Sequence, residues 1–270
     1  MTSSRDSVAR ELSALLRGWS LDDPWSDKPG TSTRTLYATD ELYEVARVRL
    51  HESLVEQSRA ASPIPPAEGR LAVVVTAGPP GAGKSTALAE EAELVAFRSI
   101  DADDFKDDLL AHADADGLLD AWTARTLGDD LPVSLRELSG FVHAESTEVA
   151  AAMRRACFAD GENVIVHGTL SSVDHTAELL EELDSYGYDR LVVFDVEAPA
   201  DIAVDRALDR WWRVRSDRSD PLGGRFVAPA AIRAYYRSGK PTVTSENARR
   251  LHDFARDLGW ESELRLIETE

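Results

Sequence analysis

The chain has 270 residues, a length that suits one α/β domain with an appendage or two small domains. It carries 30 Lys and Arg against 49 Asp and Glu, which gives a formal net charge of −19 at pH 7. This balance disfavours a protein that coats nucleic acid and one that docks on anionic lipid, because both need clusters of Lys and Arg. With 43% apolar residues, the chain can still bury a core.

Nothing in the sequence indicates a membrane or secreted protein. No apolar run reaches the roughly 18 residues of a transmembrane helix, and the start of the chain lacks the apolar stretch of a signal peptide. The single cysteine, Cys157, has no partner for an internal disulfide. We therefore expect a cytoplasmic protein that makes no contact with a membrane.

The chain divides into two parts by pattern. We expect residues 1–68 to form an N-terminal extension, with a helix over about 40–59 that ends at the proline-rich linker of residues 63–66. Residues 19–33 are rich in Pro, Gly, Asp and Ser and predict a loop. In residues 69–270, short β-branched runs alternate with amphipathic stretches, which is typical of a parallel sheet flanked by helices.

This alternation predicts an α/β fold with helices on both faces of the sheet. The expected strands cover residues 71–76, 97–101, 163–167, 191–196 and 263–267. The expected helices cover residues 141–159, 174–186 and 199–213. Residues 216–224 are polar, contain a glycine pair and predict a mobile loop. Near the N-terminus, Leu12, Leu15 and Leu16 share one helix face, which could dock on the body or on another chain.

The strongest motif follows the first expected strand. It fits the pattern G-x-x-x-x-G-K-[ST] of a phosphate-binding loop and consists of Gly78, Pro79, Pro80, Gly81, Ala82, Gly83, Lys84, Ser85 and Thr86. Its glycines let consecutive N–H groups point at phosphate oxygens, Lys84 is suited to the β- and γ-phosphates, and Ser85 is suited to Mg²⁺. The bland alternative is a glycine-rich turn that contains a lysine, which the flanking strand and helix disfavour. The motif predicts a protein that binds a nucleoside triphosphate, ATP or GTP.

Acidic residues come directly after the second expected strand. Asp101 and Asp103 are placed where a parallel sheet binds its ligands, at the carboxyl ends of strands. Asp103 could accept the proton of an attacking hydroxyl group, and either carboxylate could serve the Mg²⁺ shell. Alternatively, the loop only caps the next helix, because Asp is a favourable N-cap residue.

Two further positions suggest an acceptor site. Glu145 falls on the apolar stripe of the expected 141–159 helix, and a buried carboxylate there needs either an arginine partner or a substrate hydroxyl or N–H group. The third strand ends at His167 and continues into a turn of small residues that contains Thr169, a turn suited to line a pocket. A lone histidine in this place is more often tied up by structural hydrogen bonds than used in chemistry.

Arginines are concentrated late in the chain. Arg206, Arg210 and Arg213 share one helix face, and three further arginines, Arg215, Arg218 and Arg225, follow in the glycine-containing stretch. Arginines on a closing lid can neutralise a transferring phosphoryl group. The alternative is ordinary surface pairing with neighbouring aspartates.

Taken in order, the motifs resemble the zeta toxin family, whose members are P-loop kinases and often the toxin half of toxin–antitoxin pairs. The matching stretches are residues 77–86, 100–106, 142–146, 163–169 and 223–229, and the resemblance extends over about residues 38–260. It implies a P-loop kinase domain over residues 69–270 with an arginine-bearing lid over about 206–228. The chain departs from the family at His167, where an acidic residue is usual, and its lid is longer, so that Arg210 or Arg213 could take the place given to Arg206.

The resemblance also implies an activity. The γ-phosphate of ATP would pass, with Mg²⁺, to a hydroxyl group of a nucleotide-sugar, the 3′-hydroxyl of the amino sugar in UDP-N-acetylglucosamine. Asp103 would act as general base, with Lys84, Arg206 and Arg225 as the other catalytic residues. Asp101, Lys106, Glu145 and Thr169 would bind the acceptor. An antitoxin protein covering the ATP site is the implied partner.

Three other functions stay open at this point. A metabolic small-molecule kinase without toxicity would use the same loop and the same base. A nucleotide-binding protein without phosphotransfer would need only the loop. A polynucleotide 5′-kinase is disfavoured by the charge of −19, although the arginine segment keeps it open for short ends.

Overall fold

The structure, a computed structural model, describes residues 4–16, 32–40, 42–237 and 241–270. It divides into two compact units. The sheet unit comprises Val55–Asp101, Ala150–Val204 and Ile232–Glu270. The helical unit comprises Met1–Leu54, Ala102–Val149 and Asp205–Ala231. The division expected at residue 68 stays a prediction, and the loop expected over residues 19–33 lies almost wholly outside the described residues.

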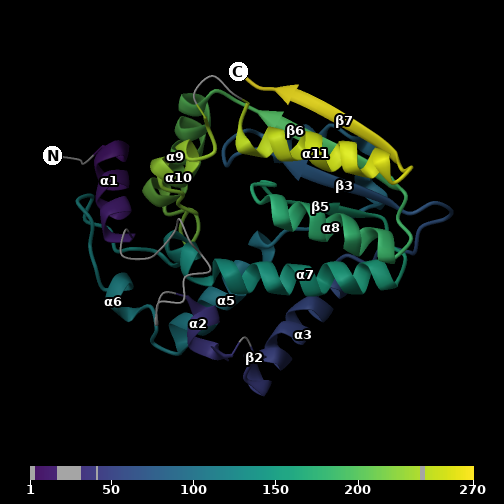
Figure 1. Cartoon of the computed structure of the whole chain (residues 1–270). Helices are drawn as coiled ribbons and strands as arrows, with labels where there is room; N and C mark the ends of the chain where they lie inside the picture. The colour runs from purple at the N-terminus through teal and green to yellow at the C-terminus, as the bar shows by residue number, and fades with distance from the viewer. Residues whose placement is uncertain (1–3, 17–31, 41, 238–240) are drawn as a thin grey trace. The chain divides into compact units, whose positions relative to one another are not determined.

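The sheet unit is built on five parallel strands, which confirms the predicted fold class (Figure 1). Their order across the sheet is β4-β5-β3-β6-β7, with every neighbouring pair parallel. The strands are β3 (Ala72–Ala77), β4 (Arg98–Ile100), β5 (Val164–Val166), β6 (Arg190–Glu197) and β7 (Glu261–Glu268). All five expected strands are therefore present, with ends that differ by one or two residues.

The central strand β3 explains why the sheet must be covered on both faces. All six of its residues are buried, and three consecutive valines, Val73 to Val75, form its middle. Helix α11 (Val243–Asp257) packs against β6, β7 and β3 and against α8 (Val173–Ser185) on one face (Figure 1). The short helices α4 (Lys84–Ala89) and η1 (Ala92–Ala96) follow the phosphate-loop motif.

A buried ion pair fixes one edge of the sheet unit. Arg98 at the start of β4 and Glu162 before β5 are each 3% exposed and bonded to each other. Arg98 also donates to the carbonyl oxygen of Ser62 at 2.6 Å, and Arg59 donates to Glu162 at 2.9 Å. Because a buried charge is tolerated only when it is paired, these contacts hold the proline-rich linker against β4.

The helical unit contains short elements from three stretches of the chain. It contains α1 (Arg5–Leu16), α2 (Thr33–Tyr37), the hairpin of β1 (Ala38–Thr39) and β2 (Leu42–Tyr43), α5 (Asp103–Ala115), α6 (Asp120–Thr123) and η2 (Leu135–Val142). It also takes in parts of α3 (Val45–Ala61), α7 (His143–Ala159), α9 (Ala200–Asp217) and α10 (Pro229–Arg233).

The N-terminal helix docks inside its own unit. Val8, Leu12 and Leu16 of α1 are at most 1% exposed, which confirms the apolar face expected there, although Leu15 is only half-buried. Arg5 pairs with Asp205 of α9 at 2.7 Å, an ion pair at the exposed edge of this contact.

Three expected boundaries are wrong. The helix expected from residue 40 begins at Val45, because Asp40 has a positive φ of 47° between the strands of the β1–β2 hairpin. The helix expected from residue 141 begins at His143, after the 3₁₀ turns of η2. The helix that was expected to end near residue 213 continues to Asp217, so much of the expected lid over about 206–228 is regular helix.

The helices in the described part of the chain do not have the properties of membrane-spanning segments. None of these helices has both the length and the hydropathy needed to span a membrane.

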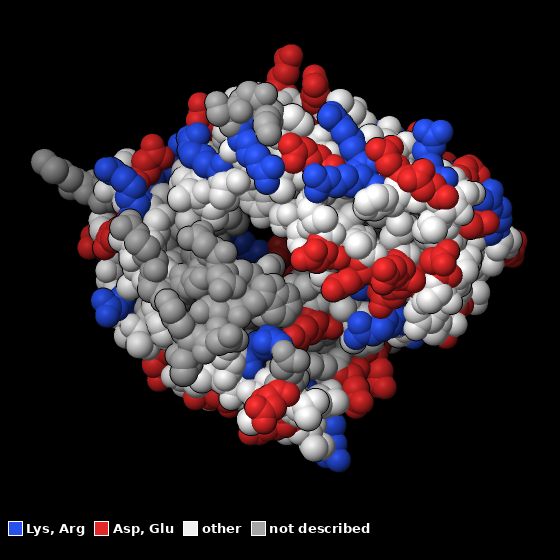
Figure 2. Space-filling model, viewed as in Figure 1, with Lys and Arg blue, Asp and Glu red and all other residues white. Residues whose placement is uncertain are grey.

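On the face seen in Figure 2, acidic and basic side chains are interspersed. Arg233 pairs with Asp201 at 2.6 Å and Arg237 with Glu246 at 3.1 Å, two ion pairs at the surface of the sheet unit.

Candidate active site

The phosphate-loop motif connects β3 to α4 in the sheet unit, and its glycines are required by the backbone. Gly78, Gly81 and Gly83 have φ values of 134°, 85° and 102°, which side chains rarely allow. A Cβ atom on Gly78 would lie 2.2 Å from the carbonyl oxygen of Val196, and one on Gly81 would lie 2.1 Å from that of Ala203. The loop is therefore seated against the end of β6 and the start of α9, and only glycine fits at these two positions.

Lys84 folds back over this loop. Its Nζ donates to the carbonyl oxygens of Gly78 at 2.7 Å and of Pro79 at 3.1 Å. Thr269, after β7, donates its hydroxyl to the carbonyl of Ala82 at 2.9 Å. Since α4 has only six residues, its dipole adds little, and the turn of backbone N–H groups together with Lys84 supplies most of the attraction for phosphate.

The donors around the loop fit a magnesium nucleotide. Ser85 is exposed at the start of α4, with its hydroxyl accessible, and Asp101 is half-buried after β4. Mg²⁺ bound with a nucleotide needs only one or two protein oxygen ligands, because phosphates and water complete its shell. His167, by contrast, is engaged in a hydrogen bond with Ser99 at 2.9 Å. The structural alternative for this histidine is thus the one observed.

Thr169 lies beside the phosphate loop through its backbone. Its carbonyl oxygen accepts from the N–H of Gly78 at 3.2 Å. One residue earlier, Gly168 bonds through both its N–H and its carbonyl to the Thr76 hydroxyl, at 3.0 and 3.2 Å. The turn after β5 is therefore bonded to Thr76 in β3 and to Gly78 just after β3. The side chain of Thr169 donates to Ser171 at 3.2 Å.

In the helical unit, two predicted residues, Lys106 and Arg225, lie around a third, Asp103, at the start of α5. Lys106 Nζ lies 2.8 Å from Asp103 Oδ1, and Arg225 Nη1 lies 2.8 Å from Asp103 Oδ2. The carboxylate is thus held between two cations, and its side chain is still 46% exposed. Burial would raise the pKa of Asp103, but Lys106 and Arg225 outweigh it and hold the pKa well below its usual range.

Arg225 reaches Asp103 from a fastened loop. A Cβ atom on Gly223, where φ is 78°, would lie 2.1 Å from the Ser134 hydroxyl, and one on Gly224 would lie 2.6 Å from the carbonyl of Trp211. Arg136 ties the same loop to α5, since it pairs with Asp107 and with Asp220 at 2.7 Å each. The glycine pair is therefore packed closely, contrary to the mobile loop expected for residues 216–224.

Of the two interpretations of Glu145, the structure shows the one in which its carboxylate pairs with cationic side chains of the protein. The side chain is fully buried, its Oε2 accepts from Arg47 at 2.8 Å, and His51 lies 2.6 Å from its Oε1. Burial opposes ionisation, but Arg47 and His51 lower the pKa of Glu145 to about 2. The acceptor-binding role of Glu145 stays a prediction. Arg47 and His51 were missed, although an inward carboxylate on a helix required a cationic partner.

The arginines of α9 fall into different environments. Arg206 is half-buried, and Arg210 and Arg213 are exposed. Arg215, in contrast, is 3% exposed and pairs with Asp129 at 2.7 Å and Glu137 at 2.9 Å. Arg225, in turn, bonds to Asp103, a predicted catalytic residue. The catalytic role of Arg206 stays a prediction.

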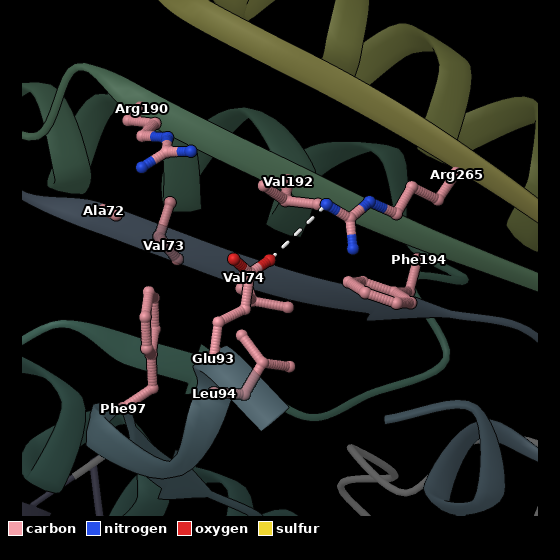
Figure 3. A pocket seen from close by; sticks show the side chains of 10 residues that line it. All are labelled: Ala72, Val73, Val74, Glu93, Leu94, Phe97, Arg190, Val192, Phe194 and Arg265. Carbon is pink, nitrogen blue, oxygen red and sulfur yellow. Dashed lines mark ion pairs between the residues drawn. The ribbon is translucent and has the colours of Figure 1, made fainter. Parts of the chain in front are cut away.

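A separate depression in the sheet unit has no connection with this chemistry (Figure 3). It lies between η1 and the face of the sheet that carries Val74, Val192 and Phe194, and its volume is about 60 Å³. Arg265 at its edge lies 3.6 Å from Glu93 and stacks over Phe194. Ligand sites for drug-sized molecules occupy roughly 300–1,000 Å³, so this depression is a packing gap.

Asp195 is a buried carboxyl group at the C-terminal end of β6, paired in register with Ala77 of β3. Its Oδ2 accepts from the Ser245 hydroxyl at 2.5 Å, whereas its Oδ1 has no hydrogen-bond partner among the described residues. Burial raises the pKa of Asp195, and the opposing effects of Ser245 and Arg249 do not cancel it.

We expect Asp195 to weaken the folded state as pH rises. A carboxyl group whose pKa is higher in the folded than in the unfolded chain favours folding while protonated, and this contribution is lost as pH rises through the folded-state pKa. In Asp195→Asn this ionisation is absent. The free energy of unfolding of the wild type should therefore fall relative to that of the variant as pH rises above the ordinary range of an aspartate, as measured by urea unfolding at a series of pH values. Parallel pH curves for the two proteins would contradict this.

Both the sequence and the fold are similar to those of known proteins. The family model described as Zeta toxin matches residues 57–256. A search of the curated proteins finds no match. Among solved structures, the fold is similar to that of AvrRxo1-ORF1:-ORF2 with ATP, with a TM-score of 0.57 and 15% identity over 88% of this chain and 73% of that one. It is also similar to the PezAT chromosomal toxin–antitoxin system of Streptococcus pneumoniae, with a TM-score of 0.56 and 14% identity over 84% and 78%.

Proposed function

The chain belongs to the zeta toxin family of kinase-type phosphotransferases, and from this premise we propose that it phosphorylates a nucleotide-sugar. The donor is ATP, and the proposed acceptor group is the 3′-hydroxyl of the amino sugar in UDP-N-acetylglucosamine. The observation that carries the proposal is the phosphate loop, in which two glycines are sterically required and Lys84 lies over the turn. This is the arrangement that nucleotide kinases use to hold triphosphate.

The proposed reaction is a single displacement at phosphorus. The acceptor oxygen forms a bond to the γ-phosphorus, the bond from that phosphorus to the β,γ-bridging oxygen breaks, and ADP leaves with the electron pair. Asp103 accepts the proton of the acceptor hydroxyl group. Lys84 and Arg225 neutralise the phosphate oxygens, with Arg206 as a further proposed cation. Mg²⁺, held by the Ser85 hydroxyl and the phosphates, would reduce the charge on the triphosphate.

The environment of Asp103 supports this role in a particular way. Because Lys106 and Arg225 lower its pKa, the carboxylate is ionised at neutral pH and ready to accept a hydrogen bond. A carboxylate of low pKa is also a weak base. Phosphoryl transfer has a loose transition state in which the proton moves late, so orientation of the hydroxyl group matters more than base strength. Lys106, Asp101 and Thr169 are proposed to contact the acceptor.

A partner protein is proposed as well. Two of the similar solved structures are the AvrRxo1-ORF1:-ORF2 complex and a toxin–antitoxin system. By analogy, we propose that an antitoxin binds this chain and covers its ATP site. Competition between that partner and ATP in a binding titration would test the idea.

The function is tested by incubating the purified chain with ATP, Mg²⁺ and UDP-N-acetylglucosamine. Mass spectrometry should find one added phosphate on the sugar nucleotide, and Lys84→Met should abolish it. Binding of ATP without any phosphorylated acceptor would overturn the nucleotide-sugar substrate. A panel of other sugars would then test the metabolic kinase, which predicts a product but no arrest of growth when the chain is expressed.

A further inference from the structure

One residue beside the phosphate loop has a strained backbone. Leu170, in the turn after β5, has a φ of 58°, in the left-handed region. For a residue with a Cβ atom this conformation is unfavourable, because the Cβ atom comes too close to the backbone carbonyl oxygen. Such strain persists only where the surroundings hold it, and it gathers at functional sites. A contact with a neighbouring residue must therefore hold Leu170 in this backbone conformation.

Asn247 of α11 supplies that contact. Its Nδ2 donates to the carbonyl oxygen of Leu170 at 2.9 Å, and the residue is 1% exposed. Asn247 lies on the inward stripe of α11 with Ala248, Leu251 and Ala255, where an apolar residue would otherwise pack. Asparagine is also a poor helix former, so Asn247 is less favourable than an apolar residue in both core packing and helix propensity. What the amide contributes at this position is the hydrogen bond to Leu170.

The turn that Asn247 holds leads directly to the phosphate loop. Leu170 follows Thr169, whose carbonyl accepts from the N–H of Gly78 at 3.2 Å. Gly78 is the first residue of the motif, and it lies so close to Val196 that no side chain fits. A change in the backbone at Leu170 therefore shifts the acceptor of the bond that fixes the start of the loop.

We propose that Asn247 is a positioning residue for nucleotide binding, acting through Leu170 and Thr169 on the phosphate loop. The inference rests on the proposed function only in that the loop binds ATP, and it is independent of the acceptor. Asn247 is not part of the phosphate-loop motif and lies 77 positions after Leu170 in the sequence.

The test uses Asn247→Leu, which keeps the size of the side chain but removes the donor. Loss of one such hydrogen bond should weaken ATP binding by about threefold to tenfold in calorimetric titration. Amide hydrogen exchange at Gly78 should become faster, an effect that can be read without any turnover. Leu251→Ala is the matched control, because it removes buried contacts from the same helix face without touching the turn, and its ATP affinity should not change.

A second variant separates positioning from general damage to α11. Glycine adopts a positive φ without penalty, so Leu170→Gly in the Asn247→Leu background should restore ATP affinity to within about twofold of the wild type. Unchanged ATP binding in folded Asn247→Leu overturns the proposal, and so does a loss that Leu170→Gly does not restore. If the nucleotide-sugar fails as substrate while these binding results hold, the proposed function is wrong and the role of Asn247 stands.

Discussion

Replacing Asp103 by Asn should lower the rate of phosphoryl transfer by about 10²–10⁴-fold, the range that a positioned general base contributes. The amide has the same size, but it cannot take the proton of the acceptor hydroxyl. It also lacks the charge that holds Lys106 and Arg225 at 2.8 Å. ATP binding should persist, because the phosphate loop is a separate segment. The product is measured by mass spectrometry and ATP binding by calorimetric titration.

Asp107→Asn is the matched control for this change. Asp107 lies one turn further along α5 and pairs with the same arginine, Arg225, at 3.3 Å, and with Arg136. It should cost far less activity if Asp103 is the base. Equal losses in the two variants would instead indicate that the carboxylates only position Arg225. A full rate in Asp103→Asn would exclude the base role altogether.

The activity should show no acid limb from Asp103 near neutral pH. Since Lys106 and Arg225 lower the pKa of this carboxyl group, its ionised form persists as pH falls and is lost only below the usual range of aspartate. The rate should therefore stay level between about pH 5 and pH 7 in a profile of kcat against pH. His143 does not titrate there either, since burial and Lys106 lower its pKa to about 4. An acid limb near pH 6 would mean that Asp103 has lost its cations in the working enzyme.

The sheet could be predicted because its signals are local. β3 is a run of buried β-branched residues, and the glycine pattern after it has a steric cause that the structure makes explicit at Gly78 and Gly81. The end of α9 could not be predicted in the same way. Polar residues 215–217 resemble loop sequence, but the burial of Arg215 and its two carboxylate partners keep the helix intact to Asp217.

The contacts that decide the roles of side chains are distant in sequence. Arg47 is 98 residues from Glu145, and Arg225 is 122 residues from Asp103. Periodicity could place Glu145 on an inward face, but it could not name the partner. Asn247 is a polar residue on the buried stripe of α11 and is thus an exception to the apolar pattern of that helix face. Exceptions of this kind are expected at functional positions.

Arg215→Met should destabilise the helical unit by about 3–5 kcal/mol, the cost of leaving a buried charge without its partner. The guanidinium group bonds Asp129 and Glu137, and Glu137 is fully buried and also accepts from Trp211 at 2.7 Å. Removing Arg215 leaves the buried carboxylate of Glu137 without its ion-pair partner. At this chain length the midpoint of thermal unfolding should fall by about 10 °C. Arg213→Met, two residues earlier and exposed, should change it by little.

The double variant shows whether the charge or the packing of Arg215 is responsible. Arg215→Met combined with Glu137→Gln removes both ends of the ion pair, so it should be less destabilised than the sum of the single variants by about 1–3 kcal/mol. The amide oxygen that replaces the Glu137 carboxylate can still accept from Trp211. Simple additivity would assign the loss to the packing of the Arg215 stem.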